Sequence, residues 1–250
     1  MGLLVSNNKY LLYIDILGFS NLVCESEKRV IELYDIIDSL NCHDHNAFKT
    51  IVFSDTMLVY NIDYNGIEAD DRYLVMFLIE FAQNLLYQTI GKDYYFRATL
   101  VYGEFIHSTP DKVERFYGKA LIDAYNKEKE IIGTGLYIDD RCNKYNNIFK
   151  TEKYNNDLSF VYLTQSIDRI LMGYLGDFPY SKFLTKDLDM FFGLKKDIKM
   201  FKTIYELKDN HPNPRVRAKH QSTWSFYEKR YSKILKDFVD SNFKIKKIFK

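Results

Sequence analysis

The sequence predicts an α/β protein, an α+β sandwich in which one layer of helices covers a largely antiparallel sheet. Apolar strand-like runs alternate with amphipathic helical segments over the first 130 or so residues. The first run ends in a glycine turn, and the chain shows no internal repeat and no low-complexity tract. With 250 residues, 46% of them apolar, the chain is long enough to bury a substantial core.

The first half of the chain carries three expected strands with helical segments between them. Residues 9–18 read as a buried strand, and residues 29–40 have apolar positions at helical spacing. Residues 48–60 form a second strand, which a turn-rich segment follows. A long amphipathic helix is expected over residues 70–90, and it leads to a third strand over residues 94–105. This order of elements favours a sheet with helices layered on it.

The second half of the chain is expected to add one helix and short strands, and then to become helical. The expected elements are a helix at 118–130, short strands within 135–165, and helices at 187–208 and 221–240. His211-Pro-Asn-Pro214 is the clearest break between the last two helices. We therefore expect a catalytic domain over residues 1–173 and a mostly helical extension over residues 174–250 that packs on it.

Composition places the protein in a broad class. The net charge of +1 gives no general reason to expect nucleic acid or an acidic membrane as a partner. The three cysteines are odd in number and lack a repeated short spacing, which suits a reducing compartment. No apolar stretch reaches the roughly 18 residues that a membrane span needs. We expect a cytoplasmic protein, with a lysine-rich end (residues 242–250) that frays.

Two aspartates stand out because each closes or interrupts an apolar, strand-like run. They are Asp15 in Tyr-Ile-Asp-Ile-Leu-Gly-Phe-Ser and Asp55 in Ile-Val-Phe-Ser-Asp-Thr. A carboxylate is costly to bury without a counter-charge, so a helix cap or a buried salt bridge is the ordinary explanation for either one alone. Two such acids on neighbouring strands can instead hold divalent metal ions beside a phosphate.

The segment after Asp15 fits that second explanation. Gly18, Phe19 and Ser20 come at an expected sharp turn into a helix, where unpaired backbone N–H groups suit a triphosphate. The carbonyl of Ile16 would add an oxygen ligand to the two carboxylates. The pattern indicates metal-assisted nucleotide chemistry.

Four segments, taken in order, resemble the motifs of class III nucleotidyl cyclases over roughly residues 9–140. The first resembles the Asp-Ile-x-Gly-Phe-(Ser/Thr) metal motif, and the second the other metal strand. The third resembles Arg-x-Gly-Ile-x-x-Gly, and the fourth the Trp/Tyr-Gly-x-x-Val-Asn-x-Ala-x-Arg loop and helix. The segments read YIDILGFSNL, VFSDTMLVY, FRATLVYGEF and FYGKALIDAYNKEKE. The resemblance implies a ferredoxin-like cyclase core.

The departures from the family pattern concern the base and the transition state. Ile51 stands where the family has its purine-binding lysine, and Arg115 where it has its purine-binding acid. The family's ribose-orienting asparagine and phosphate-binding arginine fall on Ile122 and Asn126. An aliphatic residue and an arginine do not offer the donor and acceptor pair that reads an adenine edge. An ordinary adenylate cyclase is therefore not expected.

Within the family, the string Tyr-Gly-x-Ala-Leu-Ile-Asp-Ala-Tyr resembles the pyrimidine cyclases of Pycsar antiphage defence. That resemblance implies conversion of UTP or CTP to 3′,5′-cyclic UMP or cyclic CMP and pyrophosphate. It also implies a second messenger that activates a separate effector of the transmembrane or TIR type. The base, uracil or cytosine, stays open, because the two differ at one edge only.

The resemblance further implies cofactors, an assembly and residue roles. Asp15, Ile16 and Asp55 would hold two divalent ions, Mn²⁺ or Mg²⁺, about 3.5–4 Å apart. A homodimer would share two active sites, each built from both protomers. Arg97 would reach a phosphate or the base, unless it forms an ordinary surface salt bridge. The remaining substrate contacts implied are Gly18, Phe19, Ser20, Ile51, Arg115, Asp123 (to ribose or to Arg97) and Asn126.

Several alternatives remain open at this point. The missing asparagine and arginine also fit a catalytically inactive cyclase-like module that binds nucleotide or protein. A dinucleotide-forming GGDEF-like enzyme ranks last, because its signature string is absent. The cations of Arg215, Arg217 and Lys219 could replace the missing arginine or form a solvated loop. Cys42-His-Asp-His45 contains zinc-ligand types, but consecutive positions point in different directions, so a solvent loop is expected.

Overall fold

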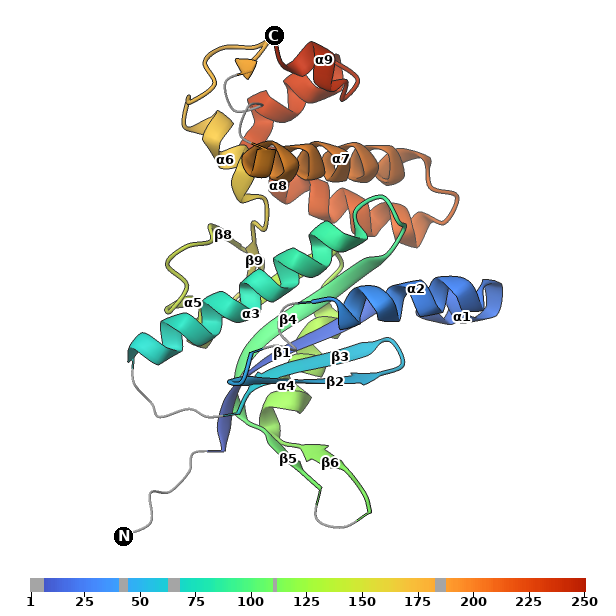
Figure 1. Ribbon diagram of the computed structural model, residues 1–250, viewed down its shortest axis with the longest axis vertical. Coiled ribbons are helices and arrows are strands. Elements are labelled where there is room, and N and C mark those ends of the chain that lie inside the picture. Colours follow the sequence, from blue (N-terminus) through green and yellow to red (C-terminus); the bar gives the residue numbers. More distant parts are fainter. Residues whose placement is uncertain (1–6, 41–44, 63–67, 110–111, 183–187) are drawn as a thin grey trace. The chain divides into compact units, whose positions relative to one another are not determined.

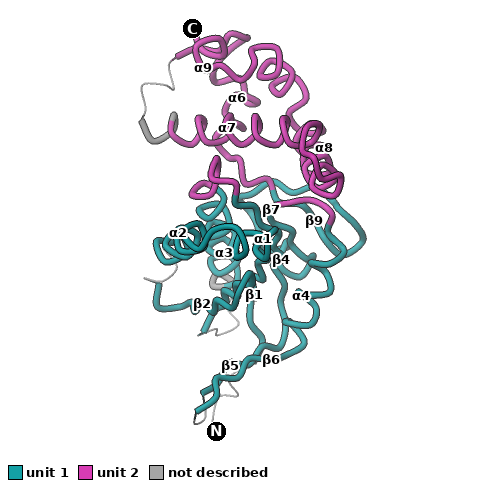
Figure 2. The backbone as a smooth tube through the Cα atoms, turned by 90° about the vertical axis from the view of Figure 1, so that its right-hand side faces the viewer, with its two compact units in different colours: residues 1–86, 94–131, 135–161 teal, residues 87–93, 132–134, 162–250 magenta. Residues whose placement is uncertain are grey.

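The structure is a computed structural model that describes residues 7–40, 45–62, 68–109, 112–182 and 188–250 (Figure 1). Its contacts divide the chain into two compact units (Figure 2). Unit 1 comprises residues 1–86, 94–131 and 135–161, and unit 2 comprises residues 87–93, 132–134 and 162–250. The division between catalytic domain and extension at residue 173 stays a prediction.

Unit 1 is built on a seven-stranded sheet in the order β2-β3-β1-β4-β7-β9-β8. All neighbouring pairs run antiparallel except β4 and β7, which are parallel. The strands are β1 Asn8–Leu17, β2 Phe48–Phe53, β3 Thr56–Asn61, β4 Tyr95–Glu104, β7 Gly135–Asp139, β8 Thr151–Lys153 and β9 Leu158–Val161. The expected mixed α/β fold with a mostly antiparallel sheet is confirmed.

The first four strands of the sheet form a ferredoxin-like unit. Helices α1 (Phe19–Glu25) and α2 (Glu27–Asp38) separate β1 from β2, and α3 (Glu68–Thr89) separates β3 from β4. The spatial order β2-β3-β1-β4 is that of the split βαβ arrangement, with β1 in the centre. Strand β1 pairs with β3 on one side and β4 on the other, and six of its ten residues are buried.

The expected single strand over residues 48–60 is wrong, because the chain turns back in its middle. Strands β2 and β3 form a hairpin in which Phe53 pairs with Thr56 across a two-residue turn of Ser54 and Asp55. Ser54 has a φ of 56°, the left-handed conformation that such tight hairpin turns require. Asp55 therefore lies at the tip of a hairpin and not inside a strand.

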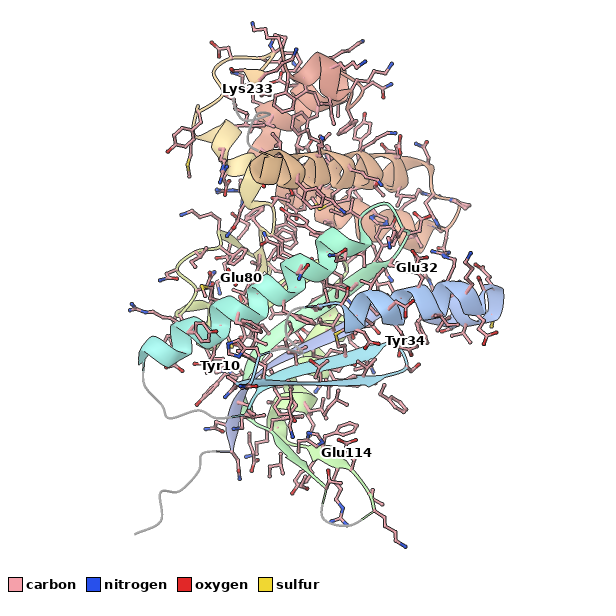
Figure 3. The ribbon with its side chains drawn as sticks, in the orientation of Figure 1. Tyr10, Glu32, Tyr34, Glu80, Glu114 and Lys233 are labelled. Atoms are coloured by element: carbon pink, nitrogen blue, oxygen red, sulfur yellow. The ribbon has the colours of Figure 1, made fainter. Side chains whose placement is uncertain are left out.

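The two faces of the sheet are covered by different helices. On one face the Tyr10 hydroxyl donates to the buried Asp71 carboxylate of α3 (Figure 3). On the other face α4 (Lys119–Glu130) packs over β1 and β4. A buried apolar cluster joins α4 to the sheet, comprising Leu11, Tyr13, Leu58, Tyr60, Val101, Phe105, Ala120 and Ala124. The short helix α5 (Asp140–Asn143) follows β7, and a separate two-stranded sheet pairs β5 (Ile106–Ser108) with β6 (Arg115–Tyr117).

Unit 2 is mostly helical, as expected for the C-terminal part. It contains α6 Gln165–Leu171, α7 Leu188–Asn210, α8 Pro214–Asp240 and α9 Ile245–Ile248. The expected break before the last long helix is shorter than predicted, because α8 begins at Pro214 and not at residue 221. Asn213 accepts a hydrogen bond from the Arg215 N–H, and proline fits the first helical position. Among the described residues, no helix is long and apolar enough to cross a membrane.

The expectation that residues 242–250 fray is wrong. Ile248 and Phe249 are buried, and Phe249 forms a parallel bridge with Tyr180. The backbone N–H of Lys250 donates to the Tyr180 carbonyl, and that of Lys182 donates to the Lys250 carbonyl. The lysines alone predicted a solvated tail, but Ile248 and Phe249 between them are buried and the segment bonds to the backbone of Tyr180 and Lys182 in unit 2.

Unit 2 contains a buried histidine that should make the protein sensitive to acid. Burial, with the nearby charges of His211 and Lys219, lowers the pKa of His220 to about 4. Folding therefore keeps His220 neutral, and its contribution is present above the unfolded pKa of about 6.5 and lost as pH falls toward 4. We expect His220→Gln to remove at most about 3 kcal/mol of pH dependence from the free energy of unfolding between pH 7 and pH 4. Urea denaturation across that range measures it, and an unchanged pH dependence would contradict it.

Candidate functional site

The site is built on one row of side chains that crosses four strands. Phe53 of β2 pairs with Thr56 of β3, Thr56 with Asp15 of β1, and Asp15 with Arg97 of β4. Directly paired residues point to the same face of a sheet, so these side chains share the face that α4 covers. The Asp15 side chain is 22% exposed, and Phe53 is 72% exposed at the edge. The row thus places the Asp15 carboxylate on the face that α4 covers, at a position that remains partly exposed.

The second aspartate lies beside this row. The Ile16 N–H donates to the Asp55 carbonyl at 2.8 Å, which fixes the hairpin tip against the end of β1. Tyr34 of α2 donates its hydroxyl to the Ser54 carbonyl at 3.2 Å and supports the same turn (Figure 3). The structure therefore brings Asp15, Ile16 and Asp55 together.

Arg97 is held by three oxygen-bearing groups. Its guanidinium pairs with Glu128 of α4, donates through Nη1 to the Ile131 carbonyl at 2.6 Å, and has Nη2 3.7 Å from Asp15 Oδ2. The side chains of Arg97 and Glu128 are 16% and 5% exposed. The buried Glu128 pair is the tight one, and the Asp15 pair is longer than a hydrogen bond. The ion pair of Arg97 with Glu128 is therefore buried, and the alternative of an ordinary surface salt bridge does not hold.

Tyr13 lies next to Asp15 on the same face, two residues earlier in β1. Burial raises the pKa of the Tyr13 hydroxyl, and the negative charges of Glu128, Asp15 and Asp55 raise it further, while a hydrogen bond with Thr56 opposes the rise. Tyr13 therefore stays a neutral hydrogen-bonding group in this acidic surrounding.

The residues present fit a divalent cation that is completed by a substrate. Among the described residues, no group of three or more His, Cys, Asp or Glu could hold a metal ion. The two aspartates supply hard oxygen ligands, and Mg²⁺ is commonly bound by one or two carboxylates together with substrate phosphates. Zinc, which favours nitrogen and sulfur ligands, does not suit this set.

The glycine turn after Asp15 has the expected shape. Gly18 has a φ of 78°, a backbone conformation that residues with a side chain rarely adopt. It directly precedes the seven-residue α1. Phe19 is buried, with its ring 6.2 Å from that of Tyr34, whereas Ser20 is exposed. Phosphate binding by this segment stays a prediction.

The two residues at the purine-reading positions lie on different strands. Ile51 of β2 pairs with Leu58 and packs, partly buried, against the apolar cluster under α4. Arg115 is exposed at the start of β6, opposite Ser108. Contact of either residue with a base stays a prediction.

Two expected substrate residues lie on α4. Asp123 pairs with Lys127 at 3.1 Å and with Arg141 of α5, whereas Arg97 pairs with Glu128 and Asp15. The alternative in which Asp123 contacts Arg97 is therefore not the arrangement seen. Asn126 is exposed near the end of the helix. Ribose binding by Asp123 and a catalytic role for Asn126 stay predictions.

The other two sequence clusters are only partly described. Cys42, His43 and Asp44 lie outside the described residues, and His45 contacts the Tyr73 hydroxyl at 2.5 Å. In the first turns of α8, Arg217 donates to the carbonyl of His211 at 2.6 Å. Arg217 thus stabilises the loop before its own helix.

Sequence reasoning missed Glu128, Tyr13 and Thr56. A signal for Glu128 exists, because Ala120, Ala124 and Glu128 repeat at a spacing of four and share the inner face of α4. A charge on that inner face requires a partner. The Ile131 carbonyl carries no sequence signal, since any residue offers a carbonyl.

The chain matches no protein-family model, and a search of curated proteins finds no match. Several solved structures are similar in backbone. They include the guanylyl cyclase Cya2, with a TM-score of 0.43 and 14% identity over 62% of this chain and 89% of that one. The guanylyl cyclase domain of the RhoGC fusion protein from Blastocladiella emersonii has a TM-score of 0.46 and 14% identity, over 62% of this chain and 94% of that one. The adenylyl cyclase CyaB from P. aeruginosa has a TM-score of 0.41 and 12% identity, over 62% of this chain and 93% of that one.

Proposed function

We propose that this protein is a nucleotidyl cyclase that converts a pyrimidine nucleoside triphosphate, UTP or CTP, to its 3′,5′-cyclic monophosphate and pyrophosphate. The observation that carries the proposal is that Asp15, near the end of the central strand β1, lies beside Asp55 at the tip of the β2–β3 hairpin, where the Ile16 N–H donates to the Asp55 carbonyl. The order of the cyclase-like motifs along the chain supports the same reading.

The chain's own residues would divide the work of the reaction. Asp15 and Asp55, with the Ile16 carbonyl, would hold two divalent ions, Mn²⁺ or Mg²⁺. When bound, such ions lower the pKa of a hydroxyl and neutralise charge on a leaving phosphate. Arg97 places a positive charge beside Asp15, and the backbone N–H groups of Gly18 to Ser20, at the start of α1, would bind phosphate.

The preference for a pyrimidine rests on what stands at the purine-reading positions. Ile51 has no hydrogen-bonding side chain, and exposed Arg115 offers donors only. An arginine fork can donate to the carbonyl oxygen that uracil and cytosine share. The resemblance to Pycsar cyclases would make the product an antiphage second messenger for a separate effector of the transmembrane or TIR type.

The direct test supplies purified protein with all four nucleoside triphosphates and Mn²⁺ in competition. We expect cyclic UMP or cyclic CMP, identified by mass spectrometry, with one pyrophosphate released per product. Cyclic AMP or cyclic GMP as the main product would refute the pyrimidine preference. Absence of any cyclic product would refute the cyclase.

A second function, a catalytically inactive nucleotide-binding module, has one observation in its favour. Ile122 and Asn126, at the positions of the usual asparagine and arginine, are both exposed on α4 and offer no cation. In that case nucleotide would bind in the presence of Mn²⁺ and be recovered unchanged.

A homodimer with shared sites has support in the exposed apolar side chains of unit 1. Tyr117 and Ile122 are 54% and 63% exposed, and Phe116 and Tyr125 lie beside them in sequence with 37% and 43%. Four such residues within ten positions of β6 and α4 are typical of an interaction surface.

Placing a charge on that surface should separate the protomers. We expect Ile122→Glu to weaken self-association at least about tenfold, because it buries an unpaired charge in the interface. Sedimentation equilibrium measures the change, and Ile148→Glu, at another exposed isoleucine of unit 1, is the control. Equal dissociation constants for the two variants would contradict the assignment.

A further inference from the structure

Arg97 is a potential competitor of any metal ion at Asp15. A guanidinium and a divalent cation seek the same carboxylate oxygens, and arginine forms its strongest contacts with carboxylates when both N–H groups of its fork engage. Yet Arg97 Nη2 stands 3.7 Å from Asp15 Oδ2, beyond hydrogen-bond distance. The contact between Arg97 and Asp15 is therefore a loose ion pair, and the tighter contacts that hold the arginine lie elsewhere in unit 1.

The residue that holds it is Glu128. One oxygen of its buried carboxylate receives both Nε and Nη2 of Arg97, and the Ile131 carbonyl receives Nη1 at 2.6 Å. These two groups come from the end of α4 and the residue just after it. They engage three of the guanidinium nitrogens, so the fork cannot turn fully onto Asp15 without breaking both contacts.

We infer that Glu128 is a positioning residue that neutralises and immobilises Arg97, which keeps the pairing of Arg97 with Asp15 loose and limits its competition with a divalent cation for that carboxylate. The inference rests on the proposed function only in taking Asp15 as a metal ligand. Glu128 itself is buried, with its side chain 5% exposed, and it pairs with Arg97. It acts on the metal through the position of another side chain.

The packing of α4 makes this arrangement rigid. Ala124 and Ala120, one and two turns before Glu128, are buried against the sheet, so the helix approaches β1 and β4 closely. Thr99 of β4 donates its hydroxyl to the Ala124 carbonyl at 3.2 Å. The carboxylate of Glu128 is thereby fixed over Arg97 by the sheet that also carries Asp15.

The test measures Mn²⁺ affinity of the full chain by electron paramagnetic resonance of free Mn²⁺, with no nucleotide present. Glu128→Gln keeps the shape of the side chain and removes its charge. We expect an affinity loss of about tenfold or more, because Arg97 can then move closer to Asp15 and pair with it more tightly. Glu130→Gln, an exposed glutamate two residues further along α4, removes the same charge and should leave the affinity within about twofold.

Two further variants separate positioning from general damage. Glu128→Asp keeps the charge and should retain most of the affinity. Glu128→Gln combined with Arg97→Gln removes both the holder and the competitor, so the affinity should return to the wild-type value or exceed it. If Glu128→Gln does not fold, the double variant is measured in its place, because it leaves neither Glu128 nor Arg97 as an unpaired buried charge. An affinity below that of the wild type in the double variant would overturn the inference.

The outcomes distinguish this inference from the proposed function. Wild-type binding that Asp15→Asn abolishes and Glu128→Gln leaves unchanged would overturn the role of Glu128 alone. A wild type that binds no Mn²⁺ would overturn the metal site and the inference with it. Loss in Glu128→Gln with recovery in the double variant would support both.

Discussion

Asp15→Asn is expected to lower the rate of cyclic nucleotide formation by about a thousandfold or more. The amide keeps the shape of the side chain, but it removes the negative charge that would hold a divalent cation next to the substrate phosphates. The measurement is initial rate of product formation at saturating Mn²⁺, with thermal unfolding to show that the fold persists. Asp15 is partly exposed at the end of a buried strand, so the loss of its charge should not unfold unit 1.

Two comparisons make this prediction specific. Asp35→Asn, an exposed aspartate on α2, is the matched control and should retain the wild-type rate. Asp55→Asn should lower the rate of product formation as much as Asp15→Asn does. The double variant should lower that rate little further, because ligands of one site act as a unit. If Asp15→Asn retained more than about a tenth of the wild-type rate, the carboxylate would have a structural role instead.

Arg97→Gln is expected to lower the free energy of unfolding by about 3–5 kcal/mol. The cost arises because Glu128, whose side chain is 5% exposed, would keep a buried negative charge without its cation. The Ile131 carbonyl would also lose a donor at 2.6 Å. Urea denaturation at neutral pH, followed by circular dichroism, measures the change.

A double-mutant cycle shows whether this cost belongs to the pair. Removing Glu128 and Arg97 together leaves no unpaired charge, so the double variant should be more stable than the sum of the single changes by about 1–3 kcal/mol. Lys153→Gln is the control, since this lysine and its partner Asp140 are both more than half-exposed, at 55% and 57%. Simple additivity at Arg97 and Glu128 would show that their contact is energetically unimportant.

Much of the fold could be predicted from the sequence, and the reason is periodicity. The expected strand at residues 94–105 is β4, and the expected helices at 70–90 and 118–130 are α3 and α4, with their ends displaced by one or two residues. Long segments with one apolar face can bury that face in only one way. The exceptions are local: the β2–β3 hairpin turns at Ser54 and Asp55 without a glycine or proline to mark it.

The sequence also singled out the acidic residues, but not the contacts around them. Asp15 and Asp55 attracted attention because a carboxylate beside apolar strand residues needs a reason. Nothing in the sequence indicated that Asp55 would stand at a hairpin tip bonded to Ile16, or that Asp123 would pair with Arg141. Those contacts depend on which strands become neighbours, and they join residues 18 to 39 positions apart.

The sequence by itself thus determined the mixed α/β class and the main strands and helices. It also singled out the two aspartates that we propose as metal ligands. The tertiary structure decided how that site is arranged: Asp15 in one row with Arg97, and Arg97 held by Glu128 of α4. The physical reason is that propensity and periodicity are local properties of the chain. The balance of charge at Asp15 is set by side chains that only the packing of α4 on the sheet brings together.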